Sequence, residues 1–144
     1  MADIRRVTES YAVAPQIDVD DFSQISSEGF KFVVNNRPDG ESFGQMPGET
    51  AREKAAEKSL GYTEVSVSGA PNMQNVDALC DVLSQNEGPI LAYCRSGTRS
   101  ITLWSMASVK LGRETPESAI EKAKNAGYDL SHLQAVLSEL AAKN

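Results

Sequence analysis

The sequence has few of the residues that build metal sites and disulfide frameworks. Its 144 residues include two cysteines, Cys80 and Cys94, and one histidine, His132. A structural zinc site takes about four Cys, His or carboxylate ligands, and small disulfide-rich folds carry at least two cysteine pairs. The sequence therefore predicts neither a metal site nor a disulfide framework. A single Cys80–Cys94 bridge is the alternative to two free thiols.

A long apolar segment is also missing. No run approaches the ~20 apolar residues that a membrane-spanning helix needs. The opening stretch, MADIRR, lacks the apolar centre of a signal peptide. We therefore expect no membrane partner and a cytoplasmic location, where thiols stay reduced.

The sequence also has fewer basic than acidic residues. The chain has 14 Lys and Arg against 20 Asp and Glu, a net charge of -6. Nucleic acid is excluded as the main partner, because binding to phosphate backbones needs a basic surface. A 40% hydrophobic share is typical of a soluble globular protein. The length predicts a single domain over residues 1–144.

Strand patterns and helix patterns alternate along the chain. We expect strands at residues 4–8, 11–14, 30–34, 62–67 and 89–93. We expect helices at residues 21–28, 50–60, 73–83, 100–111, 115–126 and 131–142. Asp20 or Asp21 is the expected cap of the first helix, and Thr115-Pro116 marks the start of the fifth. Such alternation predicts a three-layer α/β fold, with a central parallel sheet flanked by helices and extra helices at its C-terminal end.

The loop that follows the strand at residues 89–93 holds the candidate site. Cys94 stands at the carboxyl end of that strand, where ligands bind in such sheets. The amides of residues 95–100 lack strand partners and lead into a helix N-terminus, which is an arrangement that binds anions. This field, together with Arg95 and Arg99, should lower the pKa of Cys94 and make it a thiolate nucleophile.

Small and hydroxyl-bearing residues complete this loop. Gly97 permits a backbone shape that other residues avoid. Ser96, Thr98 and Ser100 supply hydroxyl donors, and we expect Ser100 to bond the sulfur of Cys94 and stabilise it as a leaving group. The simpler alternative is that Cys94 is a small buried residue in an ordinary turn.

We expect structural roles for the other cysteine and for the histidine. Cys80 lies on the apolar face of a predicted helix, so we expect it to pack in the core. His132 is far from Cys94 in sequence, and we expect a surface or capping role, with a general-base role as the alternative.

Two separated motifs resemble a known family. The order of elements around the cysteine loop resembles the dual-specificity branch of the protein tyrosine phosphatases. Residues 29–41 (GFKFVVNNRPDGE) and 91–100 (LAYCRSGTRS) resemble more closely the phosphatase-like domain of the β-lactamase hydrolase-like protein, over about residues 3–112. That domain also occurs fused to persulfide dioxygenases and to sulfide oxidation proteins. The resemblance implies a dual-specificity-phosphatase-like fold and cysteine-based chemistry, and we expect no cofactor.

The loop departs from the phosphatase signature of His-Cys, five residues and Arg. Tyr93 replaces the histidine, four residues separate Cys94 from Arg99, and Ser100 stands where the phosphatase arginine would be. The pattern of Cys94, Arg95, Gly97 and Arg99 resembles the rhodanese loop, which binds sulfane sulfur.

A second departure concerns the general acid. Phosphatases of this kind place an aspartate after the preceding strand, but residues 65–74 (VSVSGAPNMQ) contain no carboxylate. General acid help is typically worth about 10²–10⁴-fold. Sulfur transfer needs no such acid, because sulfite and low-pKa thiolates leave readily.

The leading expectation is therefore a sulfurtransferase that works through a Cys94 persulfide. The loop amides and Arg99 would hold the persulfide, and Arg95 would orient a small anionic sulfur donor. Arg37 lies in the long loop at residues 35–48; it either lines the rim of the site or forms a structural ion pair. Persulfide-handling redox enzymes are further expected partners. The alternatives are a cysteine-based phosphatase acting on phosphoproteins or small phosphate esters, and a non-enzymatic anion-binding module.

Overall fold

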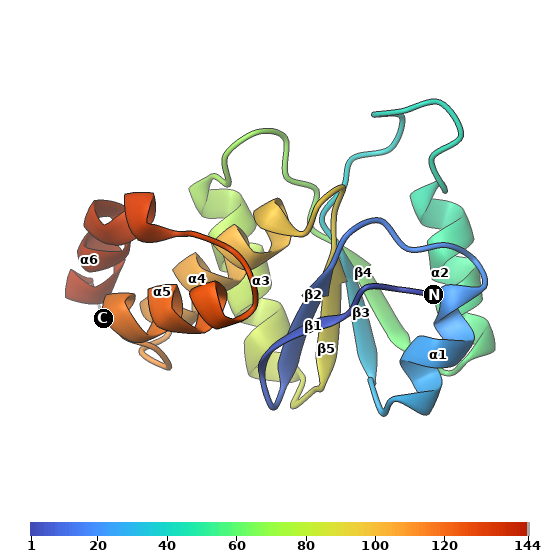
Figure 1. Ribbon diagram of the computed structural model, residues 1–144, viewed down its shortest axis with the longest axis horizontal. Helices are drawn as coiled ribbons and strands as arrows, with labels where there is room; N and C mark the ends of the chain where they lie inside the picture. The colour runs from blue at the N-terminus through green and yellow to red at the C-terminus, as the bar shows by residue number, and fades with distance from the viewer. Residues whose placement is uncertain (144) are drawn as a thin grey trace.

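The computed structural model describes residues 1–143, built around a mostly parallel five-stranded sheet (Figure 1). The strands are β1 (Arg5–Thr8), β2 (Tyr11–Ala14), β3 (Phe32–Asn35), β4 (Gly61–Glu64) and β5 (Ile90–Tyr93). Their order is β1-β2-β5-β3-β4, and only the edge strand β1 runs antiparallel to its neighbour. The predicted parallel sheet is confirmed, with β1 as an antiparallel addition.

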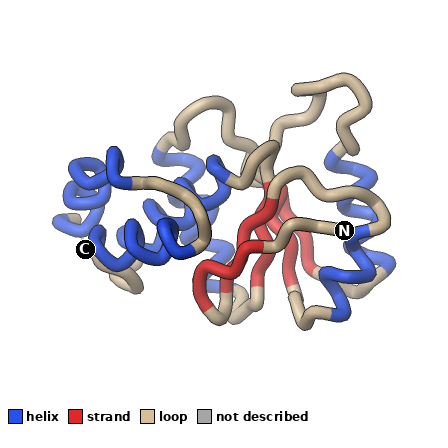
Figure 2. Tube along the Cα trace, in the orientation of Figure 1, coloured by secondary structure: helices blue, strands red, loops and turns tan. Residues whose placement is uncertain are grey.

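Helices cover both faces of this sheet (Figure 2). One face carries α1 (Asp21–Ser27) and α2 (Gly48–Glu57), and the other carries α3 (Met73–Gln85) and α4 (Thr98–Lys110). The C-terminal elements α5 (Pro116–Asn125), η1 (Ser131–Leu133) and α6 (Gln134–Ala142) follow. Both α5 and α6 pack against α4, and α5 also contacts the edge strand β1. This arrangement confirms the three predicted layers and the extra helices.

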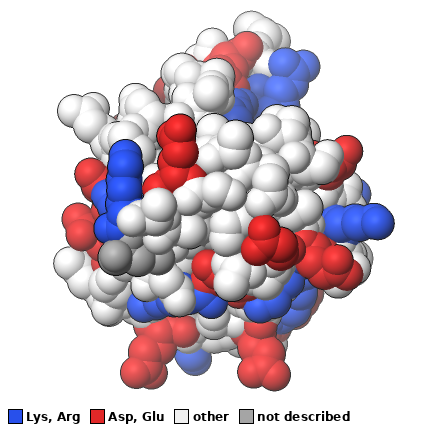
Figure 3. All heavy atoms as spheres, turned by 90° about the vertical axis from the view of Figure 1, so that its left-hand side faces the viewer, with Lys and Arg blue, Asp and Glu red and all other residues white. Residues whose placement is uncertain are grey.

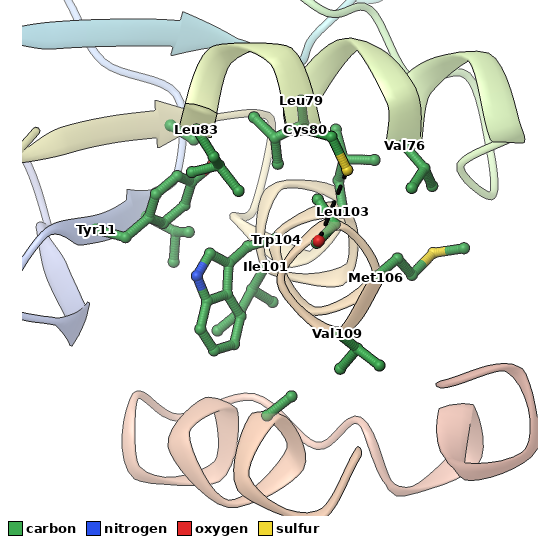
Figure 4. Close-up of a cluster of buried hydrophobic side chains, with 14 of the residues drawn as sticks. Tyr11, Val76, Leu79, Cys80, Leu83, Ile101, Leu103, Trp104, Met106 and Val109 are labelled. Carbon is green, nitrogen blue, oxygen red and sulfur yellow. Dashed lines mark hydrogen bonds between the residues drawn. The ribbon is translucent and has the colours of Figure 1, made fainter. Parts of the chain in front are cut away.

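Two apolar clusters fill the spaces on either side of the sheet. The larger cluster lies between the sheet, α3, α4 and the C-terminal helices, and Figure 4 shows part of it. Cys80 belongs to it and directs its sulfur toward the carbonyl of Ala107, at 3.7 Å (Figure 4). Both cysteines are free and buried. The core position predicted for Cys80 is therefore confirmed, and the Cys80–Cys94 bridge is not formed.

The helix α4 is buried along most of its length. All ten residues from 100 to 109 are buried, including Ser100, Trp104 and Ser105. The sheet and α3 cover part of its circumference, and α5 and α6 cover the rest. A helix enclosed in this way is held along its length by packing, so the position of its N-terminus is fixed by the whole molecule.

Several element boundaries differ from the sequence expectations. The helix α4 begins at Thr98, two positions before residue 100, because Gly97 adopts a left-handed conformation as its N-cap. Gly61 begins β4 rather than ending the preceding helix, which stops at Glu57. Asp20 makes no side-chain cap bond to α1. Thr115 does form the predicted cap of α5, as part of a capping box with Ser118.

Within residues 1–143, no helix combines the length and the apolar character needed to cross a bilayer.

Candidate functional site

Three loops meet at the carboxyl edge of the parallel strands (Figure 1). One is the turn after β5 that begins with Cys94, and the other two follow β3 and β4. Parallel pairing of β3 with both β4 and β5 brings these three loops together, because it aligns the carboxyl ends of the strands. Segments that are distant in the sequence therefore come together at the strand ends where the site was predicted.

The thiol of Cys94 lies at the base of its loop and is 0% exposed. The amide of Gly97 donates a hydrogen bond of 3.1 Å to the sulfur. The helix α4 starts at the next residue, so its unpaired N-terminal amides lie beside the same loop. Amide donors and a helix N-terminus together form an arrangement that binds anions.

Position 97 requires a glycine, both for its backbone conformation and for the space around it. Its φ of +92° lies in the left-handed region, and a Cβ at this position would collide with the hydroxyl of Tyr128. That hydroxyl donates a 2.9 Å hydrogen bond to the carbonyl of Ser96. The Arg5 guanidinium lies over the Tyr128 ring, 5.3 Å from its centroid. The loop is thus closed on one side by a residue from the C-terminal part of the chain.

Arg99 is held by the loop that follows β3. Its Nη1 donates to Glu41 at 2.8 Å and to the carbonyl of Val67 at 2.7 Å, and its Nη2 donates to Glu41 at 2.8 Å. An arginine has five N–H groups, so these bonds leave two for a bound anion. The hydrogen bond to Glu41 is the main cause that raises the pKa of Arg99, and the neighbouring Cys94 side chain is a smaller one.

Arg37 supports Glu41 from the other side. Its side chain is only 5% exposed and donates to Glu41 at 2.9 Å, to Gln16 at 3.1 Å and to Ser42 at 2.9 Å. Of the two alternatives for Arg37, the structure places it in the structural ion pair. The amide of Gln16 donates in turn to the carbonyl of Arg95, at 3.2 Å. A closed ring of contacts therefore runs from the cysteine loop through Gln16, Arg37, Glu41 and Arg99.

Glu41 is the main residue of this site that sequence reasoning missed. The hydrogen bonds from Arg99 and the one from Arg37 lower its carboxyl pKa from 4.5 to about 2. A carboxyl held in this way stays ionised near neutral pH and has no proton to give to a leaving group. Its place in the motif at residues 29–41, four residues after Arg37, was the available signal.

The hydroxyl residues of the loop serve different purposes. The side chain of Ser96 donates to Thr98 at 3.0 Å, and both residues are exposed, as is Arg95. The expected bond from Ser100 to the sulfur is not formed. The Ser100 hydroxyl is buried and has no hydrogen-bond partner among the described residues, because its position in the first turn of α4 encloses it in the core.

Tyr93 belongs to the apolar cluster on the α1 and α2 face of the sheet, and it is 1% exposed. Its carbonyl accepts a 2.8 Å hydrogen bond from the amide of Asn36. The Asn36 side chain donates to the carbonyl of Val65 at 2.9 Å. Asn36 thereby ties together the ends of β3, β4 and β5, the strands that carry the three loops.

A pocket of about 370 Å³ adjoins the loop on the C-terminal side. Thr98 and Arg99 line it together with His132. The surface position expected for His132 is confirmed, since the residue is exposed, but the large sequence distance from Cys94 was misleading. The chain returns to the loop after α5, where Tyr128 already contacts it. Among residues 1–143, no three His, Cys, Asp or Glu side chains are grouped so that they could hold a metal ion.

Comparison with known proteins identifies the relatives of this chain. The sequence profile of the beta-lactamase hydrolase-like protein, phosphatase-like domain, matches residues 3–111. The beta-lactamase hydrolase-like protein of Agrobacterium fabrum is 36% identical over 87% of this chain, and that of Xylella fastidiosa is 31% identical over 86%. The chain spans 29% of the length of each of these relatives.

Solved structures agree with this result. A candidate phosphatase of Neisseria meningitidis is 27% identical, with a TM-score of 0.82 over 95% of this chain and 97% of that one. The phosphatases Tk-PTP and PTPMT1 are 14% and 16% identical, each with a TM-score of 0.75 over more than nine-tenths of both chains. These two likenesses show a shared phosphatase fold.

Proposed function

The chain belongs to the family of the beta-lactamase hydrolase-like protein, phosphatase-like domain, and from that premise we propose that it is a cysteine-dependent phosphatase. Its substrates would be phosphate compounds whose leaving groups depart without protonation. The observation that carries the proposal is the Cys94 thiol, which receives an amide hydrogen bond in a loop that also supplies Arg99 and a helix N-terminus.

The proposed reaction has two steps. The Cys94 thiolate attacks phosphorus, the bond between phosphorus and the ester oxygen breaks, and the oxygen leaves with the electron pair. Water then attacks the phosphocysteine, which releases inorganic phosphate and restores the thiolate. The amides of the loop and the two remaining N–H groups of Arg99 would stabilise the charge on the phosphoryl oxygens.

The restriction to good leaving groups rests on the carboxylates near the site. The loop after β4 has none, and Glu41 is held ionised by two arginines. Without an acid, an alkoxide leaves slowly, whereas a nitrophenolate or an acetate leaves as the anion. Aryl and acyl phosphates are therefore the proposed substrate class.

The test is the dependence of the rate on the leaving group. We expect kcat/KM, which reports the step in which the leaving group departs, to fall by about 10²-fold or more from p-nitrophenyl phosphate to a simple alkyl phosphate. Turnover should disappear in Cys94→Ser, with Thr8→Ser, far from the loop, as the matched control. Equal kcat/KM values for aryl and alkyl esters would contradict this proposal.

Sulfur transfer is the second candidate, and the spacing between Cys94 and Arg99 favours it. Four intervening residues instead of five make a tighter loop, which suits one sulfur atom better than a phosphoryl group. The Cys94 thiolate would attack the sulfane sulfur of thiosulfate or a persulfide and break its bond to sulfite or thiolate. A second thiolate would then take the outer sulfur from Cys94. In this candidate reaction, Arg95 would orient the anionic sulfur donor.

Two assays on one preparation separate the candidates. Sulfur transfer predicts thiocyanate from thiosulfate and cyanide, and a mass gain of one sulfur atom that maps to Cys94. The phosphatase proposal predicts phosphate release and a phosphorylated Cys94 in acid-quenched samples. The persulfide-handling partners and the cytoplasmic location expected from the sequence stay predictions.

A further inference from the structure

The pocket beside the cysteine loop has a composition unlike the rest of this acidic protein. Three segments form its walls: the loop after β4, the first turns of α4, and η1 with the start of α6. The residues that line it are Gly69, Ala70, Pro71, Thr98, Arg99, Thr102, Met106, His132, Leu133 and Val136. None of these is acidic, although the chain has 20 Asp and Glu.

Apolar side chains line part of the pocket. Met106 extends from α4 on the opposite side from Tyr11 (Figure 4). Val136 of α6 also lines the pocket, and its side chain is 40% exposed. Figure 3 shows the side of the molecule that α5 and α6 form, where charges of both signs are interspersed around a wide uncharged area.

Arg99 and Thr98 connect this pocket to the anion-binding loop. Both residues line the pocket, and both stand in the first turn of α4, directly after the Gly97 amide that bonds Cys94. A ligand with its anionic group at the loop would therefore have this pocket, which Met106 and Val136 also line, beside it. The volume of about 370 Å³ lies at the lower end of the range for small-molecule sites.

We propose that this pocket binds the uncharged, apolar part of an anionic substrate, in the form of an aromatic ring, while the anion occupies the Cys94 loop. This inference rests on the proposed function in one respect, which is that the anionic group is a phosphate. Leu133 and Val136 lie beyond residue 111, where the family match ends. The pocket would thus give this chain a substrate preference that the matched segment does not encode.

A binding experiment tests the pocket without requiring turnover. The probes are phenylphosphonate and methylphosphonate, titrated calorimetrically into the full chain with Cys94 intact. We expect the phenyl compound to bind about tenfold more tightly or better, because its ring is removed from water. In Val136→Asp, which places a charge at the exposed edge of the pocket, that ratio should fall to about two or less.

The control is Val19→Asp, at an equally exposed valine in the segment between β2 and α1. It should keep the wild-type ratio. Equal affinity of the two phosphonates, no measurable binding of phenylphosphonate, or an unchanged ratio in Val136→Asp would each overturn the inference. A retained ratio together with absence of phosphate release would instead reject the proposed function and leave the pocket standing.

Discussion

Glu41 shows how a single carboxylate controls a cationic site. It contacts Arg99 through both oxygens and receives a further bond from Arg37. It therefore fixes the direction of the Arg99 guanidinium. The negative charge has a second effect, because it opposes the approach of an anion. These two effects can be separated experimentally, since one acts on kcat and the other on KM.

We predict that Glu41→Gln lowers kcat for p-nitrophenyl phosphate about tenfold, since Arg99 loses its fixed orientation. KM should stay equal or fall, because a negative charge near the anion is removed. Steady-state kinetics at neutral pH measures both constants. Glu49→Gln, at an exposed carboxylate in the first turn of α2, is the control and should change neither constant. A raised KM with unchanged kcat would contradict the positioning role.

The pKa of Glu41 also predicts a pH dependence of stability. The carboxyl titrates at about 2 in the folded chain and at 4.5 ordinarily. Its contribution to the free energy of unfolding is therefore fully present above pH 4.5 and is lost as the pH falls toward 2. Urea unfolding between pH 5 and 2 should show a smaller loss of stability in Glu41→Gln than in the wild type. Parallel curves for the two proteins would argue against this ion pair in solution.

Gly97 and Tyr128 are coupled by steric contact. An alanine in the left-handed conformation costs about 1–2 kcal/mol. Gly97→Ala should lower the free energy of unfolding by more than that cost, because the new methyl group would collide with the Tyr128 hydroxyl. Tyr128→Phe alone should cost about 0.5–1.5 kcal/mol through the lost bond to Ser96. The double variant should be less destabilised than the sum of the single variants, since phenylalanine makes room. Unfolding in urea measures all four proteins, and strict additivity would contradict the contact.

At the level of elements, two helix starts offer a direct comparison. The capping box of α5 satisfies two backbone amides through Thr115 and Ser118, whereas Asp20 makes no side-chain cap bond to α1. Thr115→Ala should lower the free energy of unfolding by about 1 kcal/mol. Asp20→Ala should change it by less than about 0.5 kcal/mol. Thermal or urea unfolding decides the point, and equal losses would refute the difference in capping.

The same two helices show what the sequence could predict. Thr115-Pro116 is a local signal, and its expected cap is present because the bonds join residues three apart. Asp20 has the right residue type, but the neighbouring Asp21 carboxylate accepts from the amide of Asp18, at 2.7 Å, and organises that turn instead. The alternation of strands and helices likewise predicted the layers, since each pattern is local.

The candidate site also has one part that the sequence could predict and another that it could not. Cys94 and Arg99 share one loop, so their spacing and the helix behind them were readable from the sequence. Glu41 lies 58 positions from Arg99, and Tyr128 lies 32 positions from Ser96. Such contacts depend on how the chain folds back, which no local pattern encodes. Ser100 was misplaced for a related reason: the helix begins two residues early and turns the hydroxyl into the core.

At the scale of the whole molecule, the C-terminal helices complete the core that the site depends on. The family match ends at residue 111, but α5 and α6 cover α4 and bring Tyr128 to the loop. A chain cut after Gly112 would expose apolar residues of α4 to water. We predict that it lacks a cooperative unfolding transition and aggregates, as judged by circular dichroism and gel filtration. A monomeric fragment with native near-ultraviolet dichroism would contradict this.

The enclosure of α4 has a consequence for the exchange of its amide hydrogens with solvent. The side chains of residues 101–109 are buried and their amides are hydrogen-bonded along the helix, so we expect those hydrogens to be replaced mainly when the entire chain unfolds. Their exchange rates thus measure global stability. An anion that binds the loop at the end of the helix would slow exchange along the full length of α4, by a factor set by ligand concentration and affinity. One isotope experiment on a buried helix would then report occupancy of a site that those amides never touch.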